Sequence, residues 1–205
     1  LFPRLDNSSW LIFRELIHNQ EIKYMSKEDI LHALHACAIP QEQLIPCLDF
    51  LQSCDNVLSF DLITKGRHLL ILDLTWWTET IQAIISPKNP FQKNGLLSID
   101  DLNKHLYDIS SYVLEDILYV LEEDHIVFRF RGQIIIPSLL QTSKPPAVNE
   151  NWPILVPVGM YECQRIYKYS QGAKHLFSCL QQELLHVPNV SNFILWESGL
   201  FLTSN

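Results

Sequence analysis

The chain has 205 residues, of which 47% are hydrophobic and 19% are charged, so it is long enough to bury a substantial core. Its formal net charge of −8 disfavours nucleic-acid binding, which needs clustered Lys and Arg, and favours a basic protein partner. There are only 6 glycines and no GxxxxGK[ST], GxGxxG or GxSxG motif, so the chain has no phosphate-binding loop or nucleophile elbow.

The cysteines indicate the cellular compartment of the chain, and its two ends indicate whether it is part of a longer protein. There are five cysteines, an odd number without CxxC spacing, which favours free thiols in a reducing compartment and therefore a cytoplasmic location. No apolar run is long enough for a transmembrane helix. The opening LFPRLDNSSW lacks the apolar stretch and cleavage site of a signal peptide, and we expect both ends to be cuts within a longer protein.

The first half alternates helices with short extended segments. Ser26 and Asp29 form a predicted capping box that opens a helix, and Pro40 suits the start of the next one. A hairpin follows, with Lys65-Gly66-Arg67 in its turn. The other expected elements are helices from Asn7 or Ser8 and over 75–86, an extended segment at 22–25, and strands at 57–60 and 68–72.

The same order returns after a loop at 87–95. Ser98 is the predicted cap of a short helix and Ser110 or Ser111 that of a longer one, and a second hairpin pairs 126–130 with 133–136. Aligning residues 47–60 with 117–130 places Leu48 on Leu118 and Phe60 on Phe130. The sequence therefore predicts two copies of a helix, helix, hairpin unit, which is the order of a winged-helix unit.

A proline-rich polar stretch at 142–151 is interpreted as a linker. Beyond it we expect strands at 154–158 and 161–169, an amphipathic helix over 171–186 and a hairpin that pairs 192–196 with 200–202. The predicted fold class is thus α+β. A mostly helical first domain of winged-helix-like units spans 1–142, and a small, incomplete α+β domain spans 143–205.

Residues that could carry chemistry are few. His32 and His35 share a helix face with Cys37 nearby, but no matching pair of metal ligands is spaced elsewhere, so we expect no metal site. Cys47 and Cys54 are interpreted as core thiols. The acidic cluster is interpreted as a solvated helix face, and it comprises Glu115, Asp116, Glu122, Glu123 and Asp124. No catalytic or cofactor-binding residue is predicted.

The winged-helix order leaves a nucleic-acid-binding module as an alternative. Its recognition helix would be 41–54 or 111–124, and neither contains a Lys or Arg. A small enzyme with a dispersed Cys and His site is a third hypothesis. Trp76 and Trp77 are adjacent and point about 100° apart on a helix. We interpret both as core, with a partner contact as the alternative role for one of them.

Several hydrophobic patterns, in their order and spacing, resemble one family. They are LDFLQSCDNVLSF followed by LLILDLTWWTETIQAII, then GLLSIDDL, ILYVLEEDHIVFRF and IIIPSLL, and after the linker RIYKYSQGAKHLFSCLQQELL and LWESGLFL. Together they resemble the COR domain (C-terminal of Roc) of Roco proteins, which include the leucine-rich-repeat kinases.

This resemblance implies a non-catalytic domain of a larger signalling protein. It would follow a Ras-like Roc GTPase domain, pack on it, relay its nucleotide state and dimerise through its second half. GTP or GDP is then expected only in that neighbouring domain. The strand from Gln133 through Ile135 to Pro137 is the expected GTPase-facing segment, with Trp77 as a further candidate contact. Gln133 stands where family members can carry an aromatic residue, which leaves the chemistry of the contact open.

Overall fold

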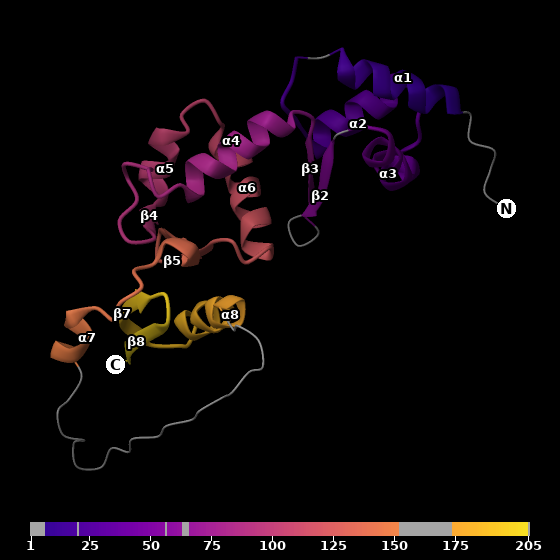
Figure 1. Ribbon diagram of the computed structural model, residues 1–205. Coiled ribbons are helices and arrows are strands. Elements are labelled where there is room, and N and C mark those ends of the chain that lie inside the picture. Colours follow the sequence, from indigo (N-terminus) through magenta and orange to yellow (C-terminus); the bar gives the residue numbers. More distant parts are fainter. Residues whose placement is uncertain (1–6, 20, 56, 63–65, 152–173, 205) are drawn as a thin grey trace. The chain divides into compact units, whose positions relative to one another are not determined.

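The computed structural model describes residues 7–19, 21–55, 57–62, 66–151 and 174–204 (Figure 1). Helices alternate with strands of small antiparallel sheets, which confirms the predicted α+β class. The chain forms two compact units, Leu1–Ile84 and Ile85–Asn205. The strands predicted at 154–158 and 161–169 lie outside the described residues. Within the described residues no helix is long and apolar enough to cross a membrane.

The first unit contains helices and strands close to those predicted for residues 1–86. Ser26 caps the second helix as expected: its Oγ accepts from the Asp29 N–H, and the Asp29 carboxylate accepts from the Ser26 N–H. The elements are α1 (Asn7–His18), β1 (Tyr24–Ser26), α2 (Lys27–Ala36), the 3-10 turn η1 (Gln41–Gln43), α3 (Leu44–Cys54), β2 (Leu58–Leu62), β3 (Arg67–Ile71) and α4 (Leu74–Ile85).

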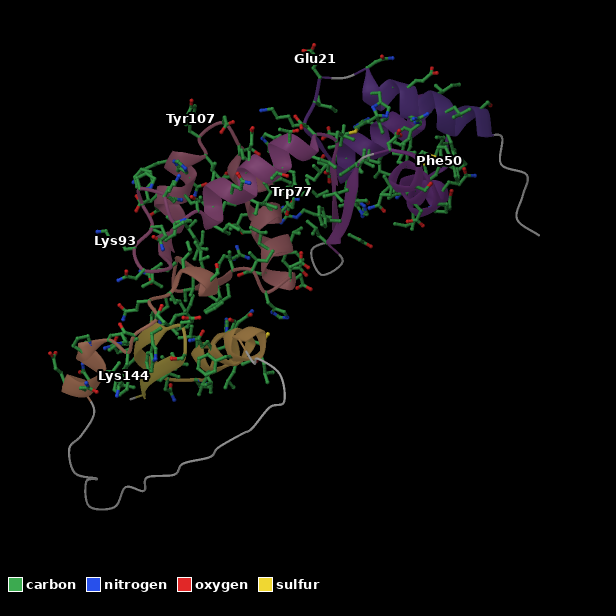
Figure 2. The ribbon with its side chains drawn as sticks, viewed as in Figure 1. Glu21, Phe50, Trp77, Lys93, Tyr107 and Lys144 are labelled. Atoms are coloured by element: carbon green, nitrogen blue, oxygen red, sulfur yellow. The ribbon has the colours of Figure 1, made fainter. Side chains whose placement is uncertain are left out.

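The sheet of this unit has the order β1-β3-β2, so the second strand of the hairpin lies in its centre. At the start of α4, Trp76 stacks on Tyr24 with ring centroids 5.2 Å apart, and Trp77 lies 5.4 Å from Phe60. Figure 2 shows Trp77 beside the hairpin strands. Both tryptophans are buried, which confirms their interpretation as core residues.

An ion pair ties the first helix to the end of the third. Asp55 follows α3, and its carboxylate accepts two hydrogen bonds from Arg14 Nε, at 2.7 and 2.9 Å, and one from Nη2 at 2.6 Å. His18 Nε2 lies 3.2 Å from the same carboxylate, whose side chain is only 6% exposed. The hydrogen bonds from Arg14 lower the pKa of Asp55 below its ordinary 3.8.

The ion pair between Arg14 and Asp55 should make the free energy of unfolding depend on pH in the acid range. Because the pKa of Asp55 is lower in the folded state, its stabilising effect is present above about pH 4 and is lost as the pH falls through the folded pKa. We expect Asp55→Asn to lower the urea midpoint at about pH 7 and to match the unchanged chain at about pH 2. Urea titrations at both pH values measure this. Asp49→Asn, an exposed α3 control, should change neither midpoint, and equal effects of the two substitutions would contradict the prediction.

The second unit repeats this order. Its first sheet has the order β4-β6-β5, matching β1-β3-β2, and the two-residue turn Arg131-Gly132 has φ values of 51° and 75°. The elements are β4 (Leu96–Ser98), α5 (Ile99–His105), α6 (Ser111–Glu123), β5 (Phe128–Phe130), β6 (Gln133–Ile135), the 3-10 turn η3 (Pro137–Leu139), α7 (Pro146–Asn151), α8 (Lys174–Leu185), β7 (Val190–Trp196) and β8 (Gly199–Ser204). The winged-helix description of these units stays a prediction.

The end of the described chain packs on this sheet. Phe128 and Ile135 share a core with Leu185 of α8 and Leu195 of β7. The stretch 142–151, which we interpreted as a linker, contains α7 in its second half, and its role as a linker stays a prediction. The predicted boundary at 142/143 falls inside the second unit, and it remains a prediction about subdomains.

Candidate functional site

The four predicted partner contacts have different surroundings. Ile135 is fully buried in the core that β6 shares with α8, and Trp77 is buried in the other unit against Phe60. Gln133 and Pro137 are half-buried, at the start of β6 and of η3. Of the four, these two are the more accessible side chains. The assignment of all four as partner contacts stays a prediction.

The residues weighed for metal or thiol chemistry do not converge. In the part of the chain that the structure describes, no three His, Cys, Asp or Glu side chains are placed to hold a metal ion. Cys47 is fully buried, as expected of a core thiol, and burial raises its pKa to about 12. Cys54 is exposed near the end of α3, so its interpretation as a core thiol is wrong.

One arrangement resembles a hydrolase triad but serves packing. Ser59 Oγ lies 2.6 Å from His68 Nε2, and His68 Nδ1 lies 3.6 Å from Asp61 Oδ1. The His68 side chain is 5% exposed, and burial lowers its pKa. A substrate has no access to so deeply buried an imidazole. The network therefore holds β2 to β3 rather than forming a reaction centre.

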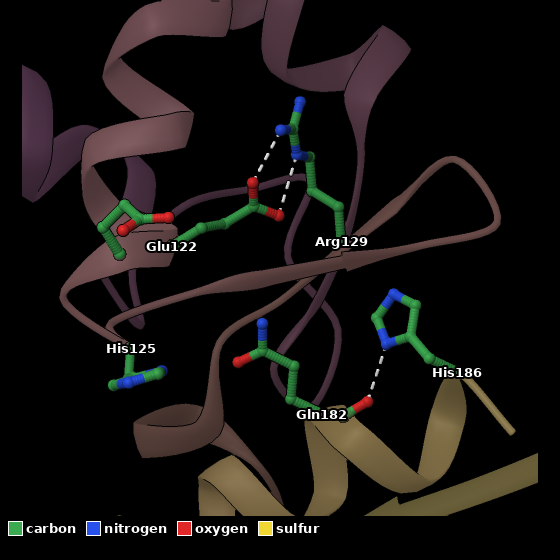
Figure 3. A pocket seen from close by; sticks show the side chains of 6 residues that line it. Glu122, His125, Arg129, Gln182 and His186 are labelled. Atoms are coloured by element: carbon green, nitrogen blue, oxygen red, sulfur yellow. Dashed lines mark hydrogen bonds and ion pairs between the residues drawn. The ribbon is translucent and has the colours of Figure 1, made fainter. Parts of the chain in front are cut away.

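A polar cavity of about 350 Å³ lies between the end of α6, strand β5 and the end of α8 (Figure 3). We call it the seam cavity, because α6 and β5 belong to the predicted first domain (1–142) and α8 to the predicted second domain (143–205). Its lining residues are Glu122, Glu123, His125, Arg129, Gln182 and His186. All six are polar or charged, which is a surface for binding a charged group rather than an apolar ligand.

Arg129 is the electrostatic centre of this cavity. Its Nε and Nη2 donate to the two oxygens of Glu122 at 2.9 and 2.6 Å, and its Nη1 donates to Glu115 at 2.6 Å. The hydrogen bonds to Glu122 raise the pKa of the guanidinium above its ordinary value. The arginine thus joins β5 to two side chains about two turns apart on α6, and it is charged at every physiological pH.

The acidic helix face therefore differs in part from the expected solvated surface, although Glu123 and Asp124 are exposed as expected. Glu115 and Glu122 are held by Arg129, and Asp116 is buried. The sequence contains a signal for the position of Arg129. It stands between Phe128 and Phe130 on a strand, so its side chain faces away from the two aromatic rings. Pairing it with glutamates seven and fourteen residues earlier needs the helix to fold back on the strand.

Replacing Arg129 by methionine is expected to cost about 2 kcal/mol, because it removes charge-assisted hydrogen bonds and leaves Glu115 and Glu122 unbalanced. Urea unfolding at neutral pH measures the loss. Adding Glu122→Gln to Arg129→Met should restore part of it, because the two sites interact and their effects are not additive. Simple addition of the two single effects would contradict this account of the network.

A family model, a relative and a solved structure are similar to this chain. The model of the family described as C-terminal of Roc, COR-A domain, matches residues 7–140. The chain is similar to probable serine/threonine-protein kinase pats1 of Dictyostelium discoideum, with 26% identity over 178 residues, which cover 81% of this chain but only 6% of that protein. It is also similar to a solved structure of Methanosarcina barkeri Roco2 RocCORdC bound to GDP, with 16% identity and a TM-score of 0.53 over 64% of this chain and 43% of that one. The structural likeness supports the fold alone.

Two successive helix-and-hairpin units are followed by a small α+β region, and ion pairs of Arg14 and Arg129 tie elements within them together. The chain belongs to the COR-A family, and its identification as a COR domain of a Roco protein is confirmed. In Roco proteins this domain is non-catalytic and occurs with the Roc GTPase domain in the same chain.

Proposed function

We propose that this chain is the part of a larger signalling protein that packs on its Roc-type GTPase domain and relays the nucleotide state. The observation that carries the proposal is the match of the COR-A family over 7–140, which includes both helix-and-hairpin units. GTP or GDP would bind only in the neighbouring domain. The partly exposed Gln133 and Pro137 are the proposed GTPase-facing contacts, and a cytoplasmic location follows from this role.

We further propose that the second half forms a homodimer. The supporting feature is an apolar stripe on α8, where Leu176, Leu180 and Leu184 recur every four residues and are 48%, 48% and 37% exposed. On the neighbouring face of the helix, the buried Gln181 donates to the backbone oxygens of Trp196 and Gly199 and anchors α8 on the last hairpin. A stripe of exposed leucines on an anchored helix suits burial between two copies.

Co-expression with the Roc-type GTPase domain of the same full-length protein tests the first proposal. We expect the two to co-purify, and Gln133→Arg to reduce the yield of the complex without unfolding this chain, as circular dichroism would show. Failure of the GTPase domain to bind in any nucleotide state would refute the proposal.

Light scattering tests the second proposal, because Leu180→Glu should convert a dimer to a monomer. A chain that is monomeric at all concentrations would refute it. The alternative of a nucleic-acid-binding module has no comparable support, since α3 and α6 contain no Lys or Arg.

A further inference from the structure

The seam cavity is surrounded by the carboxyl-terminal ends of two helices. Glu122 and Glu123 close α6, and Gln182 lies in the last turn of α8, with His186 directly after it. A helix carries about half a negative charge at this end, and cations are favoured there. In α6 the last turn contains no basic residue and ends instead on two glutamates. Both helix ends and the side chains therefore make the cavity negative.

The hydrogen-bonding groups that line the cavity also favour a positively charged donor. The Nε, Nη1 and Nη2 atoms of Arg129 already donate to Glu122 and Glu115. His186 Nδ1 lies 2.8 Å from the backbone oxygen of Gln182, which only accepts, so this ring nitrogen carries the proton. In the tautomer that carries only this proton, Nε2 is an acceptor, and Figure 3 shows the other ring nitrogen turned toward the side where Arg129 lies. The carboxylate of Glu123 adds two further acceptor oxygens to the lining.

We propose that the seam cavity is a socket for an arginine side chain of a partner protein. About 350 Å³ is at the small end of ligand pockets, which suits one long side chain rather than a cofactor. The acceptors come from different elements, Glu123 on α6 and His186 after α8. A planar guanidinium has five donors and can bond two acceptors at once, whereas a Lys ammonium is a compact point charge. The net charge of −8 also attracts a basic partner.

The socket would couple two parts of the chain. Glu123 belongs to the residues that the COR-A family matches, and α8 lies beyond them. An inserted arginine would contact both and favour the arrangement in which they lie together. This inference goes beyond the proposed GTPase interaction and does not depend on it.

A peptide titration tests the socket without a GTPase domain. The probe is the acetylated and amidated tripeptide Gly-Arg-Gly, and its neutral counterpart carries citrulline in place of arginine. Amide and imidazole NMR signals of the 205-residue chain report binding. We expect saturable shifts confined to the ends of α6 and α8 with the arginine peptide, and none with the citrulline peptide, because the charge is what the cavity recognises.

Matched glutamine variants complete the test. Glu123→Gln should weaken the arginine peptide about twofold to fivefold, the usual effect of one solvent-accessible ion pair. Glu183→Gln is the control, because Glu183 is an exposed α8 residue outside the cavity lining, and it should leave the affinity unchanged. Shifts scattered over the surface without saturation, equal shifts with citrulline, or equal effects of the two variants would each overturn the proposal.

Discussion

Replacing Gly95 by alanine is expected to destabilise the second unit by about 3 kcal/mol, combining overpacking with a disfavoured backbone conformation. Gly95 has φ +80°, and a Cβ there would lie 2.8 Å from the Ile136 oxygen and 2.8 Å from the Leu140 nitrogen. The same glycine accepts a 2.7 Å hydrogen bond from the Ile136 N–H, so its backbone is fixed in place. For a chain of this size the loss corresponds to a Tm about 6–12 °C lower, measurable by calorimetry.

Gly132 provides the matched control, because it also has a positive φ of +75° but no atom within 4 Å of the added Cβ. Gly132→Ala should cost about 1 kcal/mol, the strain term alone. A loss at Gly95 no larger than that at Gly132 would show that the contacts with Ile136 and Leu140 are unimportant.

Truncating Ile135 to alanine is expected to cost about 2–5 kcal/mol, as for other fully buried aliphatic side chains. The side chain lies in the core shared by β5, β6, α8 and β7, so the cavity left behind would be enclosed on several sides. Chemical denaturation of the isolated chain measures this, with no GTPase domain present.

A substitution of Gln133, two residues earlier on the same strand, distinguishes an effect on stability from an effect on partner binding. It is only half-buried, so Gln133→Ala should cost less than about 1 kcal/mol, and its main effect should be on the GTPase complex. If Gln133→Ala unfolded the chain as readily as Ile135→Ala, the strand would be purely structural and the proposed contact would be wrong.

Local sequence signals predicted most of the described elements. The Ser26 capping box, the Ser110 cap and the two-residue turn at Arg131-Gly132 each depend on nearby residues, and each occurs where expected. The similar strand orders of the two sheets likewise follow from the matching hydrophobic patterns around Phe60 and Phe130.

Contacts between residues far apart in the chain could not be predicted from local sequence patterns. Arg129 donates a hydrogen bond to Glu115, which lies 14 residues earlier in the chain. The polar Gln181 is buried because two backbone oxygens of the last hairpin accept its hydrogen bonds. The orientation of α8 shows the consequence. Its leucine stripe marks the exposed side, whereas Gln181 and Leu185 are buried. Periodicity identifies an apolar side of a helix but not the element that covers it.

The central claim is that this COR domain both binds a Roc-type GTPase domain and responds to its nucleotide. A relay requires different affinities for the two nucleotide states, because a partner that binds both equally shifts no population. The decisive measurement is the Kd between this chain and the GTPase domain loaded with GDP or with a non-hydrolysable GTP analogue. The account predicts a difference of at least about fivefold, which is the lower end of typical coupling energies. Equal dissociation constants would contradict the relay, and absence of binding in both states would contradict the claim as a whole.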